Sequence, residues 1–281
     1  MKLAVSKYVA GVGMIIVAVV AFAIGLYANP LIMPSARATD KSWDNVVSAG
    51  KIRAGTEPGW PPYEYLNTTT SQIIGFEIEL TEAIASKLNL TVEWHNVGFD
   101  TIIPAIQSGE LELGVSGFSV TADRLEVVQF TMPHSITEGQ IIMLNSTKTA
   151  KGIDMLTSIS QLSTLNIKVG TQTGTTEEGE LLGAIPHGLV TSYTTYLDAL
   201  TAMKTGLIDC VYAETPITSN WILEASQQSQ PPIVIVYRRP YYPVAFVANK
   251  DANRLVAKIN GALAEIIASG QVDTLKQKWK C

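Results

Sequence analysis

The chain has 281 residues, enough for one large core or for two lobes of ordinary domain size. Hydrophobic residues make up 47% of it and charged residues 16%, which is the composition of a globular protein rather than of a disordered one. The formal net charge is −5, and it becomes −8 without the three basic residues that precede position 39. A surface this acidic disfavours nucleic acid as a partner.

The N-terminus predicts export. Lys2 and Lys7 precede an uncharged apolar run over residues 8–28, close to the ~20 residues that a membrane helix needs, and their charge places its start in the cytoplasm. Two outcomes stay open for residues 1–40. The run is longer than a usual signal-peptide core, which favours a retained membrane anchor plus linker. Residues 36–38 have the small-x-small pattern of a cleavage site, which would make the segment a signal peptide.

The first half of the chain alternates between helical and extended patterns. Leu80, Ile84 and Leu88 recur at helical spacing and predict a helix after residue 75. Before and after it the sequence predicts a short helix within residues 39–50, strands at 51–56 and 91–94, and extended segments at 127–133 and 141–144.

One pattern occurs twice. Residues 100–109 and 197–206 each read as a short helix that stops at a glycine, Gly109 or Gly206. Each is followed by a brief apolar strand, at 111–115 or 207–211, and then by small and polar residues. Ligands of α/β sheets lie just beyond the carboxyl ends of such strands. The repeat therefore predicts two similar lobes with a cleft between them.

The remaining elements continue the alternation and predict an α/β fold. They are a strand at 167–170 with a turn at Gly174 and a helix after it, strands at 233–237 and 244–247, and helices at 252–268 and 271–280. Cys210 and Cys281 are the only cysteines. In an oxidising compartment they could form a disulfide, and two unpaired thiols are the alternative.

Arg124 has two interpretations. Thr121 is a plausible N-cap, which puts Arg124 in the first helical turn, where a cation opposes the helix dipole at a cost of about 0.3–1 kcal/mol. It could be a surface residue that pairs with Asp123 or Glu126. It could instead turn back over the helix start and bind a carboxylate with its planar guanidinium.

Other candidate residues are similarly ambiguous. Thr175 and Glu178 have the spacing of a capping box, but the glycine turn before them also presents amides to an anion. Glu214 follows the second repeated strand and could be either a helix cap or the acid that binds an ammonium group. Trp60 and Phe99 could serve packing alone. No metal-ligand spacing, cofactor loop or nucleophile–histidine pair is evident, so we expect no metal and no cofactor.

Several motifs together resemble the extracytoplasmic solute-binding proteins of polar amino-acid ABC transporters, bacterial solute-binding protein family 3. The resemblance spans about residues 48–280, with the motifs in the family's order and spacing. They lie at residues 53–64, 75–80, 99–109, 121–124, 130–133, 174–176, 214–216 and 278–279.

The resemblance implies a two-lobed periplasmic-binding-protein fold of type II, with two hinge strands at about 134–139 and 237–242. Lobe one would comprise residues 41–135 and 241–281, and lobe two residues 136–240. Some family members carry a tyrosine where this chain has His134, so the first hinge departs from the pattern.

The resemblance also implies a binding site. Arg124 corresponds to the residue that binds the ligand α-carboxylate, and Glu214 to the acid that binds the α-ammonium, where most relatives carry Asp. The remaining implied residues are Gly117, Ser119, Thr175 and Thr176 as backbone and hydroxyl partners, Trp60 and Phe99 around the ligand side chain, and Glu57 beside them.

The implied function is capture of a free amino acid outside the cytoplasm and delivery to an ABC permease, without enzymatic activity. Aromatic faces next to a carboxylate favour a cationic side chain, arginine or lysine, with glutamine as the runner-up. A periplasmic dehydratase of the same fold, acting on prephenate or arogenate, is the enzymatic alternative, and a sensor domain is a third class.

Overall fold

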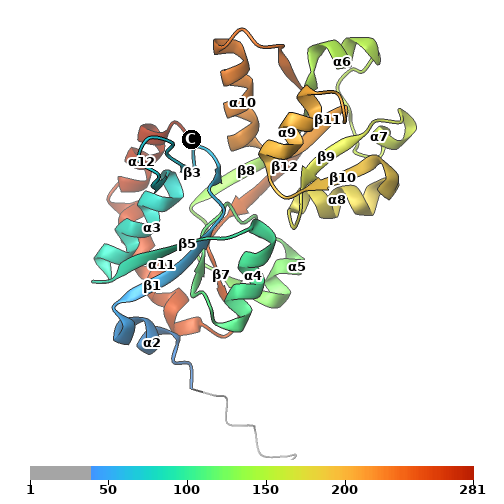
Figure 1. Cartoon of the computed structure of the whole chain (residues 1–281). Helices are drawn as coiled ribbons and strands as arrows, with labels where there is room; N and C mark the ends of the chain where they lie inside the picture. Colours follow the sequence, from blue (N-terminus) through green and yellow to red (C-terminus); the bar gives the residue numbers. More distant parts are fainter. Residues whose placement is uncertain (1–38) are drawn as a thin grey trace, which may run out of the picture. The chain divides into compact units, whose positions relative to one another are not determined.

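The computed structural model describes residues 39–281, of which Asp40–Cys281 form one compact unit (Figure 1). The predicted signal peptide or membrane anchor lies outside the described residues. Within residues 39–281, no helix has both the length and the apolar character of a membrane span. The fold is α/β, as the alternation of elements predicts, and it has two lobes, each with its own five-stranded sheet.

The first lobe is built on a sheet with the strand order β5-β1-β6-β13-β7. The strands β5, β1 and β6 are parallel, whereas β13 runs antiparallel to both of its neighbours. A small sheet of β2, β3 and β4 lies beside α3. The elements are α2 (Ser42–Ala49), β1 (Lys51–Thr56), β2 (Gly59–Trp60), β3 (Glu64–Leu66), β4 (Ile73–Ile74), α3 (Phe76–Lys87), β5 (Thr91–Asn96), α4 (Phe99–Ser108), β6 (Leu113–Gly114), α5 (Ala122–Val127), β7 (Val128–Phe130), β13 (Val247–Asn249), α11 (Asn253–Ala268) and α12 (Gln271–Trp279).

The second lobe has a sheet with the strand order β10-β9-β11-β8-β12. Here β10, β9 and β11 are parallel, and β8 runs antiparallel to β11 and β12. Its elements are β8 (Ser135–Leu144), α6 (Asn145–Ala150), α7 (Gln161–Thr164), β9 (Val169–Gln172), α8 (Thr176–Ala184), the 3₁₀ turn η1 (His187–Leu189), β10 (Val190–Tyr193), α9 (Tyr196–Lys204), β11 (Cys210–Glu214), α10 (Thr215–Gln227) and β12 (Ile233–Val244).

Two long strands carry the chain between the lobes. The chain enters the second lobe through β8 and returns through β12, and these two strands pair from Leu144 with Ile233 to Ser135 with Val244. The predicted hinge segments, 134–139 and 237–242, fall on the first-lobe ends of these strands or next to them. The division into residues 41–135, 136–240 and 241–281 itself stays a prediction.

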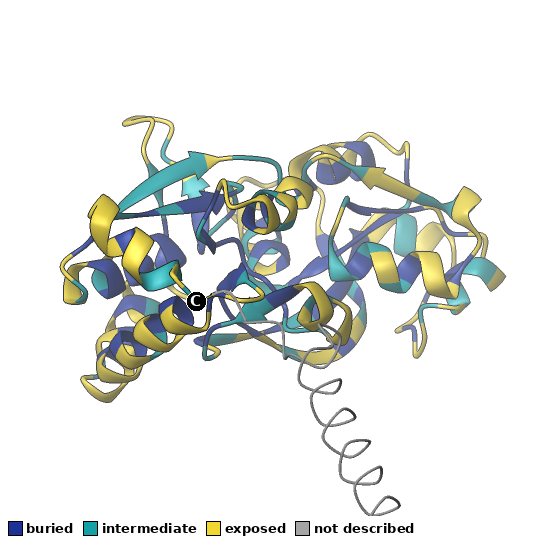
Figure 2. Cartoon of the chain, turned by 90° about the horizontal axis from the view of Figure 1, so that it is seen from below, coloured by how far each residue is buried: buried dark blue, intermediate teal, exposed yellow. Residues whose placement is uncertain are grey.

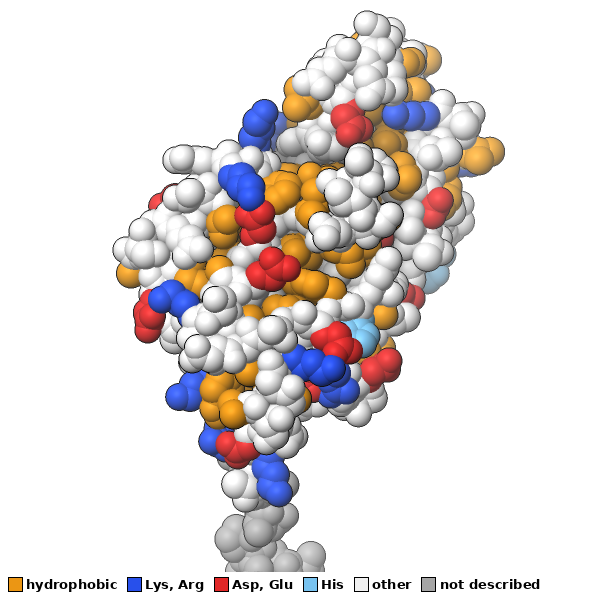
Figure 3. Space-filling model, turned by 60° about the vertical axis from the view of Figure 1, so that its left-hand side comes forward, with side chains coloured by type: hydrophobic (Ala, Val, Ile, Leu, Met, Phe, Trp, Pro, Cys, Tyr) orange, Lys and Arg blue, Asp and Glu red, His pale blue; other side chains and the backbone are white. Residues whose placement is uncertain are grey.

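Apolar side chains fill each lobe between its sheet and its helices. Figure 2 shows buried strands inside both lobes and exposed outer faces on the surrounding helices. Ile52 and Phe246 are fully buried in the first lobe, and Ile141 and Tyr212 in the second. Burying an aliphatic or aromatic side chain of this size contributes about 1.5–3 kcal/mol. On the face in Figure 3, acidic and basic side chains are interspersed and form no basic stripe.

Several strand predictions were wrong in their limits, among them the following two. The second repeated strand, predicted at 207–211, begins only at Cys210, because Leu207 is 70% exposed in the turn that follows α9. The strand predicted at 244–247 is the end of β12 and the start of β13, because the chain changes sheets between Val244 and Val247. Both thiols are free, with Cys210 buried in β11 and Cys281 exposed.

Candidate functional site

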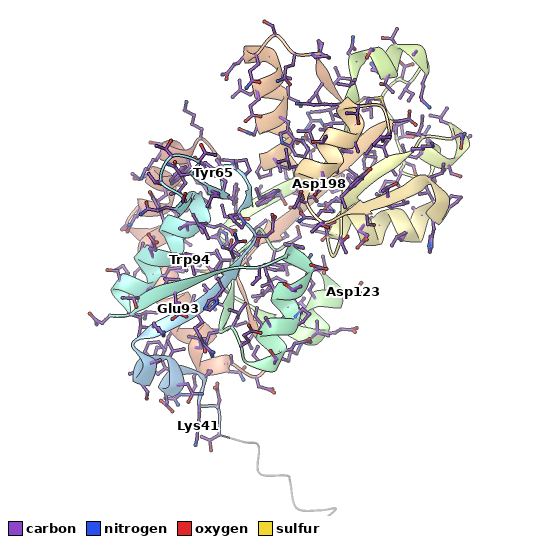
Figure 4. All side chains as sticks on the ribbon, in the orientation of Figure 1. Lys41, Tyr65, Glu93, Trp94, Asp123 and Asp198 are labelled. Carbon is purple, nitrogen blue, oxygen red and sulfur yellow. The ribbon has the colours of Figure 1, made fainter. Side chains whose placement is uncertain are left out.

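One cavity between the lobes brings all nine predicted site residues together. It lies where β1, β9 and β11 reach their carboxyl ends. In Figure 4, Asp123 marks α5 of the first lobe and Asp198 marks α9 of the second, on the sides where the lobes face each other. The lining residues are Glu57, Trp60, Glu64, Phe99, Ser116, Gly117, Ser119, Arg124, Gln172, Thr175, Thr176, Glu177, Tyr196 and Glu214.

Arg124 turns back over the start of its own helix. Thr121 caps α5 by accepting a hydrogen bond from the Arg124 amide at 3.3 Å. The guanidinium then donates to the carbonyl of Ser119 at 3.0 Å and, across the cleft, to the carbonyl of Gly174 at 3.2 Å. This geometry matches the clamp interpretation rather than a surface pair with Asp123 or Glu126.

Aromatic rings flank the Arg124 guanidinium, and no carboxylate contacts it directly. Its Cζ lies 5.5 Å from the ring centroid of Phe99 and 5.3 Å from that of Phe118. No carboxylate of residues 39–281 lies within 4 Å of the guanidinium nitrogens. Burial lowers the pKa of Arg124, and the charges of Glu214 and Glu177 oppose that shift. A planar cation held in this way is suited to bidentate binding of a carboxylate.

The start of α8 faces Arg124 from the second lobe. Thr175 caps this helix by accepting from the Glu178 amide at 3.3 Å, while the Glu178 carboxylate accepts from the Gly174 amide at 2.7 Å. The reciprocal bond of the predicted capping box therefore ends one residue earlier than expected. Gly174 has φ +78°, and a Cβ there would lie 3.0 Å from Cβ of Asp100 in the first lobe. Only glycine allows this close approach.

Four carboxylates line the cavity. Glu214 ends β11 and accepts from the Ser119 hydroxyl of the first lobe. Glu177 accepts from the Tyr196 hydroxyl at 3.3 Å, and Gln172 donates to Glu57 at 3.4 Å. The fourth is Glu64, which is fully buried.

Burial favours the protonated form of these carboxyl groups. Burial raises the pKa of Glu57, Glu64 and Glu214, and burial together with the charge of Glu214 raises the pKa of Glu177 to about 8. Arg124 is the only lysine or arginine among the lining residues. The cavity thus holds four carboxyl groups and one guanidinium, and a cation bound beside the carboxyl groups would favour their ionised form.

Two aromatic residues form apolar walls. Trp60 packs against Tyr63 with ring centroids 4.8 Å apart, and its ring covers Gly117, where a Cβ would approach within 2.2 Å. Phe99 stacks on Phe118 at 4.9 Å and an angle of 20°. Both aromatic side chains are therefore fixed by packing as well as exposed to the cavity.

A buried pair behind the site explains the unusual His134. Its Nε2 lies 2.8 Å from Oε1 of Glu77, and both side chains are fully buried. The other Glu77 oxygen accepts from the Gly117 amide at 3.0 Å. The Gly117 amide therefore already donates a hydrogen bond within the protein. The backbone group of Gly117 that remains to bind a ligand is its carbonyl.

Sequence reasoning missed several lining residues, Glu64, Ser116, Gln172, Glu177 and Tyr196. Glu64 lies within a motif that the family shares, and Glu177 follows the predicted α8 cap, so their positions next to motifs were the available signal. Residues 39–281 contain no group of three or more histidine, cysteine or acidic side chains arranged to hold a metal ion.

Comparison with known proteins identifies the family. Residues 52–280 match the bacterial extracellular solute-binding proteins, family 3, and the chain belongs to that family. It is 25% identical to "ABC transporter arginine-binding protein 1" of Escherichia coli (strain K12), over 83% of this chain and 91% of that protein. It is 28% identical to "Probable histidine-binding protein" of Campylobacter jejuni, over 82% of this chain and 84% of that protein.

A solved structure shows the same fold. An ancestral arginine-binding protein bound to arginine has a TM-score of 0.72 and 29% identity, and the match covers 82% of this chain and 98% of that one. The ancestral protein has also been solved with glutamine bound.

Proposed function

We propose that this family 3 solute-binding protein captures a basic amino acid, arginine or lysine, outside the cytoplasm and delivers it to an ABC permease. The observation that carries the proposal is the cavity lining, which holds four carboxyl groups, of Glu57, Glu64, Glu177 and Glu214, and one cation, Arg124. Arg239 pairs with Glu177 and Glu214, whereas Glu57 and Glu64 form no ion pair within residues 39–281, so a ligand with a neutral side chain would leave these two acids without a cation. A cationic side chain supplies the missing positive charge.

The two ends of an amino acid fit opposite parts of the site. The carboxylate would lie between the Arg124 guanidinium and the start of α8 at Thr175 and Thr176, where a helix dipole favours an anion. The ammonium would bind Glu214, with the Ser119 hydroxyl next to it. Because these groups come from both lobes, a bound amino acid would stabilise the closed arrangement.

The side chain would then extend between Trp60 and Phe99 toward Glu57. Aromatic faces attract a guanidinium or ammonium by roughly 0.5–2 kcal/mol, and a nearby carboxylate adds to this. The arginine-binding relatives named above support this choice. Glutamine is the runner-up, because its amide can donate to Glu57 and the ancestral protein accepts it.

Isothermal titration calorimetry of the purified protein against all twenty amino acids tests the proposal. We expect arginine and lysine to bind most tightly, ahead of histidine and glutamine. A preference for glutamate or leucine would contradict the cationic pocket, although the clamp for the amino-acid backbone could stand. Conversion of prephenate or arogenate by the same preparation would contradict a purely binding role.

A further inference from the structure

Arg239 is a buried arginine that the proposed function leaves without a role. It lies in β12, within the second predicted hinge segment, and is 6% exposed. The pairing of β12 with β8 shifts register between Arg238 and Tyr241, so Arg239 sits in an irregularity of the strand. Such irregularities redirect side chains. Arg239 points inward as a result, whereas the side chain of its neighbour Arg238 is 47% exposed.

The Arg239 guanidinium joins three acids of the second lobe. Nη1 donates to Glu180 at 2.9 Å and lies 3.0 Å from Oε1 of Glu177, an ion pair without hydrogen-bond alignment. Nη2 donates to Oε1 of Glu214 at 3.3 Å. One planar group therefore contacts two of the carboxylates that line the cavity, Glu177 and Glu214.

Both crossing strands shape the space around Arg239. In β8, a Cβ on Gly139 would lie 3.0 Å from Cζ and Nε of Arg239, so the absence of a side chain there leaves room for the guanidinium. In β12, the ring of Tyr242 covers the guanidinium, with its centroid 4.2 Å from Cζ. The position of Arg239 thus depends on the geometry of the segment that connects the lobes.

The charge of Arg239 acts on the pKa of the two cavity acids that it contacts. Burial raises the pKa of Glu177 and of Glu214, the charge of Glu214 adds to this rise for Glu177, and Arg239 opposes it by lowering the pKa of each. The other groups that face it are Glu180, Tyr212 and Tyr242, with Arg124 farther away. A guanidinium can stabilise two carboxylates at a fixed spacing, which a single ammonium cannot.

We infer that Arg239 is a positioning residue, which holds Glu177 and Glu214 side by side as the carboxylates that receive the ligand α-ammonium. It contacts these acids from behind and is not among the residues that line the cavity. Through Arg239, the geometry of the second crossing strand is tied to that of the ammonium site. This inference rests on the proposed function, because it assigns the α-ammonium to Glu214.

The test compares three variants in the full chain, Arg239→Met, Arg239→Lys and the matched control Arg238→Met, which removes the exposed arginine next to it. Affinity is measured for L-arginine by calorimetry, and for the arginine analogue without the α-amino group by displacement of L-arginine. Circular dichroism melting checks the fold. We expect Arg239→Met to weaken L-arginine binding about tenfold or more, about 1.4 kcal/mol. Its effect on the analogue should stay below about threefold, because the analogue has no ammonium group.

Arg239→Lys keeps the charge but cannot span both acids, so its loss should be intermediate and again specific to L-arginine. If Arg239→Met fails to fold, the comparison of the two ligands is made with Arg239→Lys. The Arg238→Met control should bind both ligands as the unmodified protein does. Equal losses for both ligands, or an unchanged affinity in both Arg239 variants, would overturn the inference while leaving the proposed function intact. An unmodified protein that binds no amino acid would overturn the proposed function itself, and this inference with it.

Discussion

The carboxylate clamp can be tested by replacing Arg124. Its guanidinium is half-buried, and its hydrogen bonds go to two neutral carbonyls, of Ser119 and Gly174. Arg124→Ala should therefore affect ligand binding far more than the empty protein. Truncating one partner of a buried, hydrogen-bonded charge pair costs about 2–5 kcal/mol, which corresponds to roughly a thirtyfold to several-thousandfold loss of affinity.

The substitution should also change what the site recognises. The unmodified protein should bind L-arginine much more tightly than its decarboxylated analogue, whereas Arg124→Ala should discriminate little between them. Arg124→Lys should restore little affinity, because lysine lacks the planar pair of donors. Arg254→Ala is the matched control, since Arg254 is an arginine that contacts Asp40 and Asp44 at a distance from the cavity.

Calorimetric titration with both ligands, together with thermal melting of each variant, tests whether Arg124 binds the ligand carboxylate. Near-normal affinity in Arg124→Ala would remove this residue from the site. A loss of affinity with unchanged discrimination between the two ligands would show that Arg124 supports the fold of the cleft and does not contact the carboxylate.

Three further predictions follow from the same cavity. Glu57→Gln should lower arginine affinity about tenfold and improve the relative binding of glutamine; intact arginine affinity in calorimetry would mean that Glu57 does not face the ligand. Because the pKa of Glu177 is raised from 4.5 to about 8, its folded form holds a proton that the unfolded chain releases. The ligand-free protein should then lose stability as pH rises from about 5 to 8 and Glu177→Gln should flatten this slope, so chemical unfolding curves with equal slopes would contradict the assignment. Small-angle scattering should show a smaller radius of gyration at saturating arginine, because a ligand held between the lobes would stabilise the contact of Arg124 with Gly174 across the cleft; an unchanged radius would contradict closure around the ligand.

The α/β fold class and the helix caps beside the cavity were predictable from the sequence. The α/β alternation, the repeated helix–strand pattern and the motif order together predicted the two-lobed architecture. The caps Thr121 and Thr175 were predictable because helix capping links residues only three positions apart, whereas the spacing left two interpretations of Arg124 open. The spacing of a few residues is enough to determine such a cap, and the packing of the lobes does not change it.

Which acids face the cavity, and which groups lie behind them, depends on contacts between residues far apart in the chain. His134 contacts Glu77, which is 57 residues away in the sequence, and Arg239 contacts Glu180, which is 59 residues away. No local sequence pattern predicts either contact. The limits of β11 and β12 also depended on the sheets, because a strand ends where its partner stops pairing, whatever its own hydrophobicity. These contacts are strong because the charged groups are buried away from water. A carboxylate that water would otherwise stabilise must find a cation or keep a proton, and only the folded chain determines which of the two is within reach.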